Sequence, residues 1–255
     1  MSGHDLALMT EAARRGGAIA LRWWRQNPQV WEKPGQGPVS EGDLAVNAAL
    51  HGQLLQARPD YGWLSEEGPV DAARLARENT FILDPIDGTR AFLAGEENFA
   101  VSLGLARGGQ MVAGVVYMPA KDRLYTATRE GPALCDGQPI HCSGQAGIDG
   151  ANVLATGATM LPEHWPGGVP EFRRTFRASL AYRLCLVAEG RYDAMLTLRD
   201  AHEWDIAAGC LIAERAGARV TDGQGGAIRF NQAKPAAPGV IAAAPGLHAA
   251  LMARR

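Results

Sequence analysis

Apolar residues at the start of the chain recur at steps of three and four positions, which is the spacing of one helix face. The series runs from Leu6 to Trp23 and predicts a helix over residues 5–26. Its middle positions are small, with Gly16 at the centre, so we expect another element to pack closely against this face.

The stretch after this helix, NPQVWEKPGQGPVS, is rich in proline and glycine, and its composition predicts a loop. A second helical pattern follows in LAVNAALHGQLLQA. Ser40 lies just before it and is a suitable N-cap, which places Asp43 in the first turn of the helix.

Three strand-like segments follow in the first half of the chain. FAVSLGLA and MVAGVVYM are separated by RGGQ, which is a hairpin signal, and RLYTATRE comes next. Two long helices followed by consecutive antiparallel strands predict an α+β arrangement.

The second half alternates strands with helices. Strand patterns occur in NVLATG, YDAMLTL and ARVTD, and helix patterns occur in SLAYRLCLVAEGR and WDIAAGCLIAERAG. This order predicts βαβ units and a mixed sheet, so the class is α+β with an α/β part. We therefore expect two domains. An α+β domain over residues 1–140 would hold the antiparallel sheet and most candidate ligands, and an α/β domain over residues 141–255 would complete the site.

The composition narrows the possible functions. The 255 residues are 47% apolar and carry a formal charge of only −2, which argues against a general nucleic-acid partner but not against a small phosphorylated ligand. No apolar run reaches the roughly 18 residues of a membrane span. The N-terminus lacks the apolar core of a signal peptide, so we expect a cytoplasmic protein without membrane contact.

The cysteines show no CxxC spacing, and a chain of this length does not need disulfides to fold. We expect four free, mostly buried thiols, at Cys135, Cys142, Cys185 and Cys210.

The stretch FILDPIDGTRAF places two carboxylates where an apolar strand ends. Pro85 favours an extended Asp84, and the turn can bring Asp84 and Asp87 to one point with the Ile86 carbonyl. Gly88 allows a ligand to approach the backbone closely. A helix that begins there would offer N–H groups to an anion.

Two carboxylates beside an anion site would repel the anion, and a hard divalent cation resolves this conflict. Mg²⁺ takes oxygen ligands from one or two carboxylates together with a substrate phosphate. The motif therefore predicts a joint site for metal and phosphate, whereas an isolated motif of this kind could also be a simple Asp-Pro turn.

Other acidic residues fit the same site. Glu66 and Glu67 follow a short apolar stretch in WLSEEG. The same sequence is also typical of a solvated turn. Asp205 opens a predicted helix, where its carboxylate would lie at the positive end of the dipole. A plain N-cap is the alternative for Asp205.

Taken together, these segments resemble the inositol monophosphatase superfamily of Mg²⁺-dependent, lithium-sensitive phosphatases. The resemblance rests on Lys33, GPVSEGDLAVN, LSEEG, LDPIDGTRAF and EWDIAAGCLIAERAGARVTD, in the family's order along almost the whole chain. It implies an αβαβα layered sandwich, a homodimer, and hydrolysis of a small phosphorylated metabolite with two or three Mg²⁺ ions.

The resemblance also implies roles for individual residues. Glu66, Asp84 and the Ile86 carbonyl would hold one metal ion, and Asp87 and Asp205 would join Asp84 around a second. Glu66 would also contact a weaker third ion, whereas Glu67 would not be a ligand. The remaining implied residues orient the attacking water or bind the substrate: Thr89 with Asp43 for the water, and Gly88, Thr89, Ser179 and Arg183 for the substrate.

The substrate is the point where the chain departs from the inositol phosphatases, which usually have a hydroxyl-binding glutamate where this chain has Leu198. Arg183 stands where related nucleotidases have a phosphate-binding lysine, unless it is a solvated surface arginine. Arg90 is also basic, as in several nucleotidases. We therefore expect a 3′(2′),5′-bisphosphate nucleotidase acting on 3′-phosphoadenosine 5′-phosphate.

Other functions remain open at this stage. An inositol-1-monophosphatase or another small-metabolite phosphatase, such as a histidinol phosphatase, is the first alternative. A protein that regulates RNA polymerase, as some bacterial members of the family do, is an alternative of another class. The nearly neutral charge and the intact acidic set both favour catalysis over that role.

Overall fold

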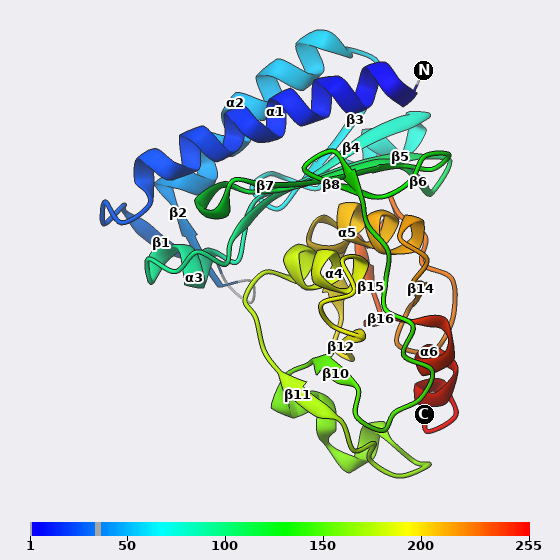
Figure 1. Ribbon diagram of the computed structural model, residues 1–255. Coiled ribbons are helices and arrows are strands. Elements are labelled where there is room, and N and C mark those ends of the chain that lie inside the picture. The colour runs from blue at the N-terminus through cyan, green and yellow to red at the C-terminus, as the bar shows by residue number, and fades with distance from the viewer. Residues whose placement is uncertain (1, 34–36) are drawn as a thin grey trace.

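Two long helices, α1 (Ser2–Trp23) and α2 (Glu41–Ala57), lie side by side over one face of a large sheet in the computed structural model, which describes residues 2–33 and 37–255 (Figure 1). A Cβ atom on Gly16 would lie 3.1 Å from the side chains of Leu50 and Val46, so the expected close packing is confirmed. The first helix ends three residues before the predicted boundary, because Arg25 adopts a positive φ of 61°.

The start of α2 follows the sequence prediction. Ser40 is the N-cap, and its side chain and that of Asp43 form a reciprocal capping box. The Ser40 amide donates to Asp43 Oδ2 at 2.8 Å, so one carboxylate oxygen of Asp43 is held at the helix start.

The stretch before α2 is not the loop that its composition predicts. β1 (Val30–Lys33) pairs antiparallel with β2 (Gly37–Ser40), and residues 34–36 of the predicted loop lie outside the described residues. A two-stranded ribbon consists only of edge strands, which tolerate Pro38. The proline and glycine content therefore did not exclude short flanking strands.

The large sheet has seven strands that follow one another in chain order. β3 and β4 are parallel, and every later pair is antiparallel, including the predicted hairpin of β5 and β6. The strands are β3 (Gly62–Ser65), β4 (Asn79–Asp87), β5 (Ala100–Arg107), β6 (Gln110–Met118), β7 (Arg123–Thr128), β8 (Leu134–Cys135) and β9 (Gln138–Pro139).

Helices α4 (Leu180–Ala188) and α5 (Glu203–Arg215) cover the other face of this sheet (Figure 1). A Cβ atom on Gly114 of β6 would come within 2.9 Å of the Ala208 carbonyl oxygen, so α5 lies directly on the strands. The division of the chain into domains 1–140 and 141–255 stays a prediction.

Beneath these helices lies a second, mixed sheet of five strands in the order β11-β10-β12-β16-β14, with α6 (Pro245–Met252) packed beside it. β10 pairs in parallel with β11 on one side and with β12 on the other, and β16 runs antiparallel to β12 and β14. The strands are β10 (Asn152–Leu154), β11 (Arg173–Thr175), β12 (Ala194–Thr197), β14 (Arg219–Thr221) and β16 (Val240–Ala243).

The layers alternate as helix, sheet, helix, sheet, helix, which confirms the predicted αβαβα sandwich. All four cysteines are free, and only Cys142 is partly exposed. Within the described ranges, no helix is both long and apolar enough to cross a membrane. The shorter elements are α3 (Thr89–Leu93), β13 (Ala201–His202), β15 (Ala236–Ala237) and the 3₁₀ turns Ala72–Ala76, Pro119–Lys121, Gly157–Met160 and Pro162–His164.

Candidate active site and metal centre

The predicted strand end at Asp84 is a bulge inside a longer strand. β4 continues to Asp87, and its register against β5 shifts between Asp84 and Asp87. Asp84 is only 1% exposed, and its Oδ1 accepts a hydrogen bond from the Ile86 amide at 3.0 Å. The extra residues of the bulge re-aim the side chains at this end of the sheet, which is a common device beside active sites.

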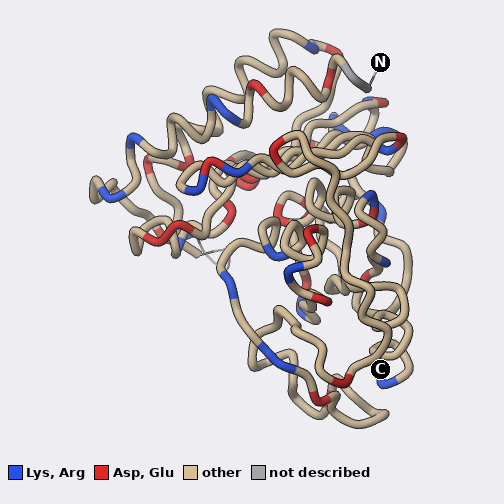
Figure 2. Tube along the Cα trace, viewed as in Figure 1, with Lys and Arg blue, Asp and Glu red and all other residues tan. Residues whose placement is uncertain are grey.

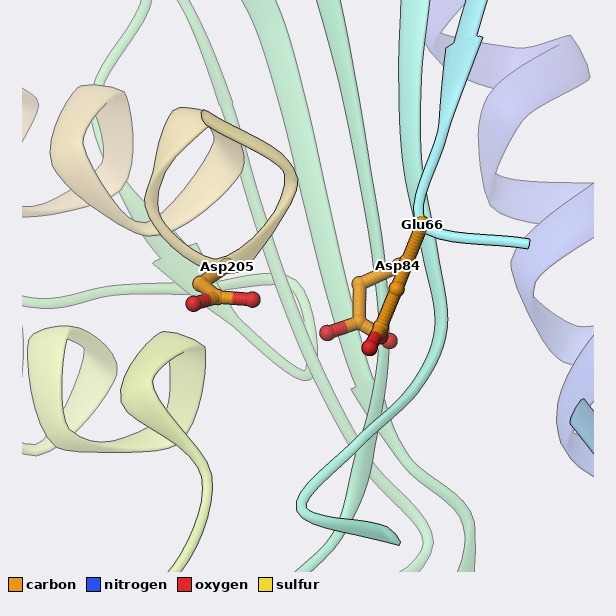
Figure 3. Close-up of side chains that lie close together, drawn as sticks. All are labelled: Glu66, Asp84 and Asp205. Carbon is orange, nitrogen blue, oxygen red and sulfur yellow. The ribbon is translucent and has the colours of Figure 1, made fainter. Parts of the chain in front are cut away.

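Three carboxylates from separate elements meet at this bulge: Glu66 follows β3, Asp84 lies in β4, and Asp205 lies in the first turn of α5 (Figure 3). One oxygen from each lies within 4.8 Å of the others. Glu66 is placed beside Asp84 because its amide bonds to the Leu83 carbonyl oxygen at 3.2 Å. His202 is the N-cap of α5, so Asp205 is not the plain N-cap that the sequence left open.

These three carboxylates fit a hard divalent cation. Burial raises the pKa of Asp84 and of Asp205 well above the ordinary value, and the charges of neighbouring carboxylates add to this effect. Burial also raises the pKa of Glu66, although the charge of Lys33 opposes it. A buried or half-buried group of carboxylate oxygens that repel one another is a donor set that Mg²⁺ or a similar ion would stabilise.

Asp87 lies in the same pocket but is not one of the three converging carboxylates. Its Oδ2 accepts hydrogen bonds from Ser179 Oγ at 2.5 Å and from the Ala181 amide at 2.7 Å, and its Oδ1 accepts one from the Leu180 amide at 3.1 Å. Asp87 therefore ties the end of β4 to the start of α4. Its expected contact with a second metal ion stays a prediction.

Thr89 lies between the backbone carbonyl of Ile86 and the side chain of Asp43. Its Oγ1 lies 3.1 Å from the Ile86 carbonyl oxygen and 3.3 Å from Asp43 Oδ1. Burial raises the pKa of Asp43 to about 6, although the hydrogen bonds from Ser40 work against this shift. The structure thus brings together the pair that the sequence assigned to the attacking water.

Lys33 connects the β1–β2 ribbon to the acidic group. Its Nζ lies 3.0 Å from Glu66 Oε1 and 2.7 Å from Glu67 Oε1. Burial works to lower the pKa of Lys33, but its bonds with the two glutamates outweigh burial and the net shift is upward. Glu67 faces Lys33 and is not one of the three converging carboxylates.

Gly88 occupies a position that a larger residue would not fit. Its φ is 98°, and a Cβ atom there would lie 2.9 Å from the Asn98 carbonyl oxygen and 3.3 Å from the Ser179 amide nitrogen. Gly88 is also the residue from which the five-residue helix α3 starts. The backbone can therefore turn tightly beside the carboxylates without a side chain filling the site.

A pocket of about 520 Å³ opens over the carboxylates, and basic side chains also line it. Arg183 is one of them and is only 7% exposed, so it is not a solvated surface residue. Its Nε donates to the Arg177 carbonyl oxygen at 2.5 Å, and its guanidinium lies 4.4 Å from the centroid of the Phe176 ring. Arg90 lines the same pocket and is exposed.

Sequence reasoning missed two further residues that line this pocket, Arg199 and His202. The His202 ring stacks on Trp204 with a centroid distance of 4.6 Å and an angle of 9°. Side chains alternate along an extended segment, so the positions of Thr197 and Arg199 could have been found from the end of the predicted strand. Leu198, between them, packs against the apolar cluster near α6 instead.

Comparisons with known proteins agree with this geometry. A family model described as the inositol monophosphatase family matches residues 4–255. The chain is 36% identical over 238 residues to an inositol-1-monophosphatase of Rhizobium meliloti, covering 87% of this chain and 86% of that protein. It is 30% identical over 233 residues to the Nus factor SuhB of Pseudomonas aeruginosa, covering 85% and 84%. The solved structure of a Thermotoga maritima IMPase superposes with a TM-score of 0.84 at 26% identity, covering 99% and 96% of the two chains.

Proposed function

We propose that this chain, which belongs to the inositol monophosphatase family of metal-dependent phosphatases, uses Mg²⁺ and acts preferentially on 3′-phosphoadenosine 5′-phosphate. The hydrolysis of small phosphate monoesters follows from the family. The choice of substrate is ours, and one observation carries it: a nearly buried arginine, Arg183, lines the same pocket as the carboxylates.

The residues that would hold the metal ions are Glu66, Asp84 and Asp205, with Asp87 and the Ile86 carbonyl completing the set. When bound there, Mg²⁺ would lower the pKa of a water molecule and offset the charge of the phosphate oxygens. The convergence of three carboxylate oxygens within 4.8 Å, one of them from the buried Asp84, supports this assignment.

Thr89 and Asp43 would orient the water that attacks phosphorus. The Thr89 hydroxyl can donate to Asp43 Oδ1 and still offer its lone pairs to a proton of that water. Asp43 Oδ2 is held by the Ser40 amide and hydroxyl, which keeps Oδ1 directed at Thr89. Gly88 and Thr89 both line the pocket, so a phosphate there could approach their amides.

Arg183 would meet the second phosphate of the substrate. A guanidinium presents a rigid fork of donors that matches phosphate better than it matches a polyol hydroxyl. The bond from its Nε to the Arg177 carbonyl leaves its two terminal nitrogens for a ligand. Ser179 lines the same pocket, although its hydroxyl already donates to Asp87.

Inositol 1-phosphate is the second candidate substrate, because the Rhizobium relative at 36% identity carries the name inositol-1-monophosphatase. The deciding experiment measures kcat/KM for both compounds with Mg²⁺, and with excess chelator as the control. We expect a higher value for 3′-phosphoadenosine 5′-phosphate, no turnover in chelator, and inhibition by lithium. A higher value for inositol 1-phosphate would replace the nucleotidase proposal with the inositol phosphatase one.

A further inference from the structure

Arg199 enters the pocket from the segment that follows β12. Thr197 and Arg199 both line the pocket, whereas Leu198 between them packs with the apolar cluster around α6. This is the alternation of an extended chain, and it leaves Leu198 out of the pocket wall. The first residue after β12 that can offer a charge to a substrate is therefore Arg199.

Arg199 and Arg183 line the same pocket, near Asp87 and Asp205 but not paired with either carboxylate. No ion pair involves either residue within 2–33 and 37–255. Burial lowers the pKa of Arg183. The charge of Asp87 opposes this shift, the charge of Arg199 adds to it, and the charge of Asp205 opposes it. Two cationic side chains that line one pocket and form no ion pair would both be stabilised by an anion placed between them.

We propose that Arg199 determines the substrate class, because together with Arg183 it holds a second phosphate of a bisphosphorylated substrate while the first phosphate lies at the carboxylates. This inference rests on the proposed function in that it places the reacting phosphate at Glu66, Asp84 and Asp205. The second phosphate can belong to a nucleotide or to a polyol, since the two guanidinium groups recognise the phosphate itself.

The surroundings of Arg199 allow a clean test of this role. Arg199 is exposed, and no hydrogen bond from its side chain is present in the described part of the chain. Replacing it should therefore leave the fold unchanged, unlike a change at the nearly buried Arg183. Arg219 in β14 is an equally exposed arginine of the same half that does not line the pocket, and it provides the matched control.

The experiment uses two substrate pairs that differ only in the second phosphate. One pair is 3′-phosphoadenosine 5′-phosphate and adenosine 3′-monophosphate, and the other is inositol 1,4-bisphosphate and inositol 1-phosphate. KM and kcat are measured with Mg²⁺ for the wild type, Arg199→Ala, Arg199→Lys and Arg219→Ala. In at least one pair we expect the second phosphate to lower KM by about 10- to 100-fold in the wild type, the range for charge-assisted hydrogen bonds.

Arg199→Ala should lose most of that advantage. Because the charge of Arg199 also acts on Asp205, any fall in kcat/KM for the two monophosphates should be by a smaller factor than the fall for the bisphosphates. Arg199→Lys should keep part of the lowering of KM by the second phosphate, and Arg219→Ala should keep all of it. An advantage confined to the inositol pair and lost in Arg199→Ala would support the inference and refute the nucleotidase proposal. An advantage that survives in Arg199→Ala, or an active enzyme with no advantage in either pair, would overturn the inference. Inactivity on all four compounds would overturn the proposed function itself, and the inference with it.

Discussion

The two walls of the pocket differ in charge, in burial and in the way the chain builds them. The acidic wall comes from β3, β4 and α5, and its carboxylates are held in place by backbone bonds and by the bulge of β4. The basic wall comes from α4 and the segment after β12, where Arg183 is nearly buried and Arg199 is exposed. Figure 2 shows further basic residues along the chain from β11 to the start of α4.

This difference suggests a division of labour between the walls. Groups that must hold a metal ion and a reacting phosphate need fixed positions, and rigid strands and helix starts provide them. Groups that recognise the rest of a substrate can vary without disturbing that chemistry. Changes in the acidic wall should therefore lower kcat for every substrate, whereas changes in the basic wall should alter KM for some substrates only.

The largest effect should follow from Asp205→Asn, which removes a charge from the acidic wall but keeps the shape of the side chain. We expect kcat to fall about 100-fold or more for all substrates, the size of effect seen when one stabilising group is lost from a transition state. Asp200→Asn is the matched control, since it makes the same change at an exposed aspartate outside the pocket. Asp200 Oδ2 pairs with Lys234 Nζ at 2.8 Å. A selective change in KM for one substrate would contradict the division between the walls.

Thr89→Ala should have the next largest effect. The hydroxyl lies within hydrogen-bond distance of the Ile86 carbonyl oxygen and of Asp43 Oδ1 and donates to one of them at a time. Its loss should lower kcat by about 10- to 100-fold with little change in KM. Thr89→Ser retains the hydroxyl and should restore most of the rate. If KM rises instead while kcat is kept, Thr89 binds the substrate rather than orienting the water.

The acidic wall could be predicted from the sequence because its residues lie in short segments whose spacing is itself informative. An apolar strand followed by DPIDGT specifies a turn, two carboxylates and a close backbone approach within six residues. The bulge in β4 and the hydrogen bonds that engage Asp87 were not predictable, because both depend on β5 and α4, which are distant in sequence.

The basic wall was harder to predict, since a single arginine in a helix or after a strand has no local signature. Arg183 was recognised only through its position in a family pattern, and Arg199 was missed. The β1–β2 ribbon was missed for a similar reason. Its strands are stabilised by pairing with each other, whereas the proline and glycine of the segment are equally typical of loops.

A change at Arg183 should have a smaller and more selective effect than the changes in the acidic wall. Arg183→Ala should raise KM for 3′-phosphoadenosine 5′-phosphate by about tenfold or more and leave adenosine 3′-monophosphate nearly unaffected. Because Arg183 is nearly buried, thermal unfolding should be measured in parallel, and Arg183→Lys provides a variant that keeps the charge. Equal losses on both substrates in a folded variant would show that Arg183 does not read the second phosphate.

The smallest effect concerns stability, and it follows from the burial of the acidic wall. Burial raises the pKa of Asp43 to about 6, that of Glu203 to about 7, and that of Asp205 well above its usual value. The folded chain therefore binds more protons than the unfolded chain from about pH 4 up to these values, so the free energy of unfolding should fall as pH rises through that window. His202 and His248 oppose this trend, because burial lowers their pKa values.

Comparing the wild type with Asp205→Asn in the same buffers cancels the contribution of the histidines. In chelator, the melting temperature of the wild type should fall more between pH 5.5 and pH 8 than that of the variant, by a few degrees, since each kcal/mol corresponds to roughly 2–4 °C in a chain of this size. Mg²⁺ should raise the melting temperature of the wild type at pH 8 and so reduce its fall between the two pH values, because the ion binds the charged carboxylates of the folded state alone. Identical pH profiles for the two proteins in chelator would mean that the folded state does not raise the pKa of Asp205. The clustering of carboxylates in the acidic wall would then not lower the stability of the protein.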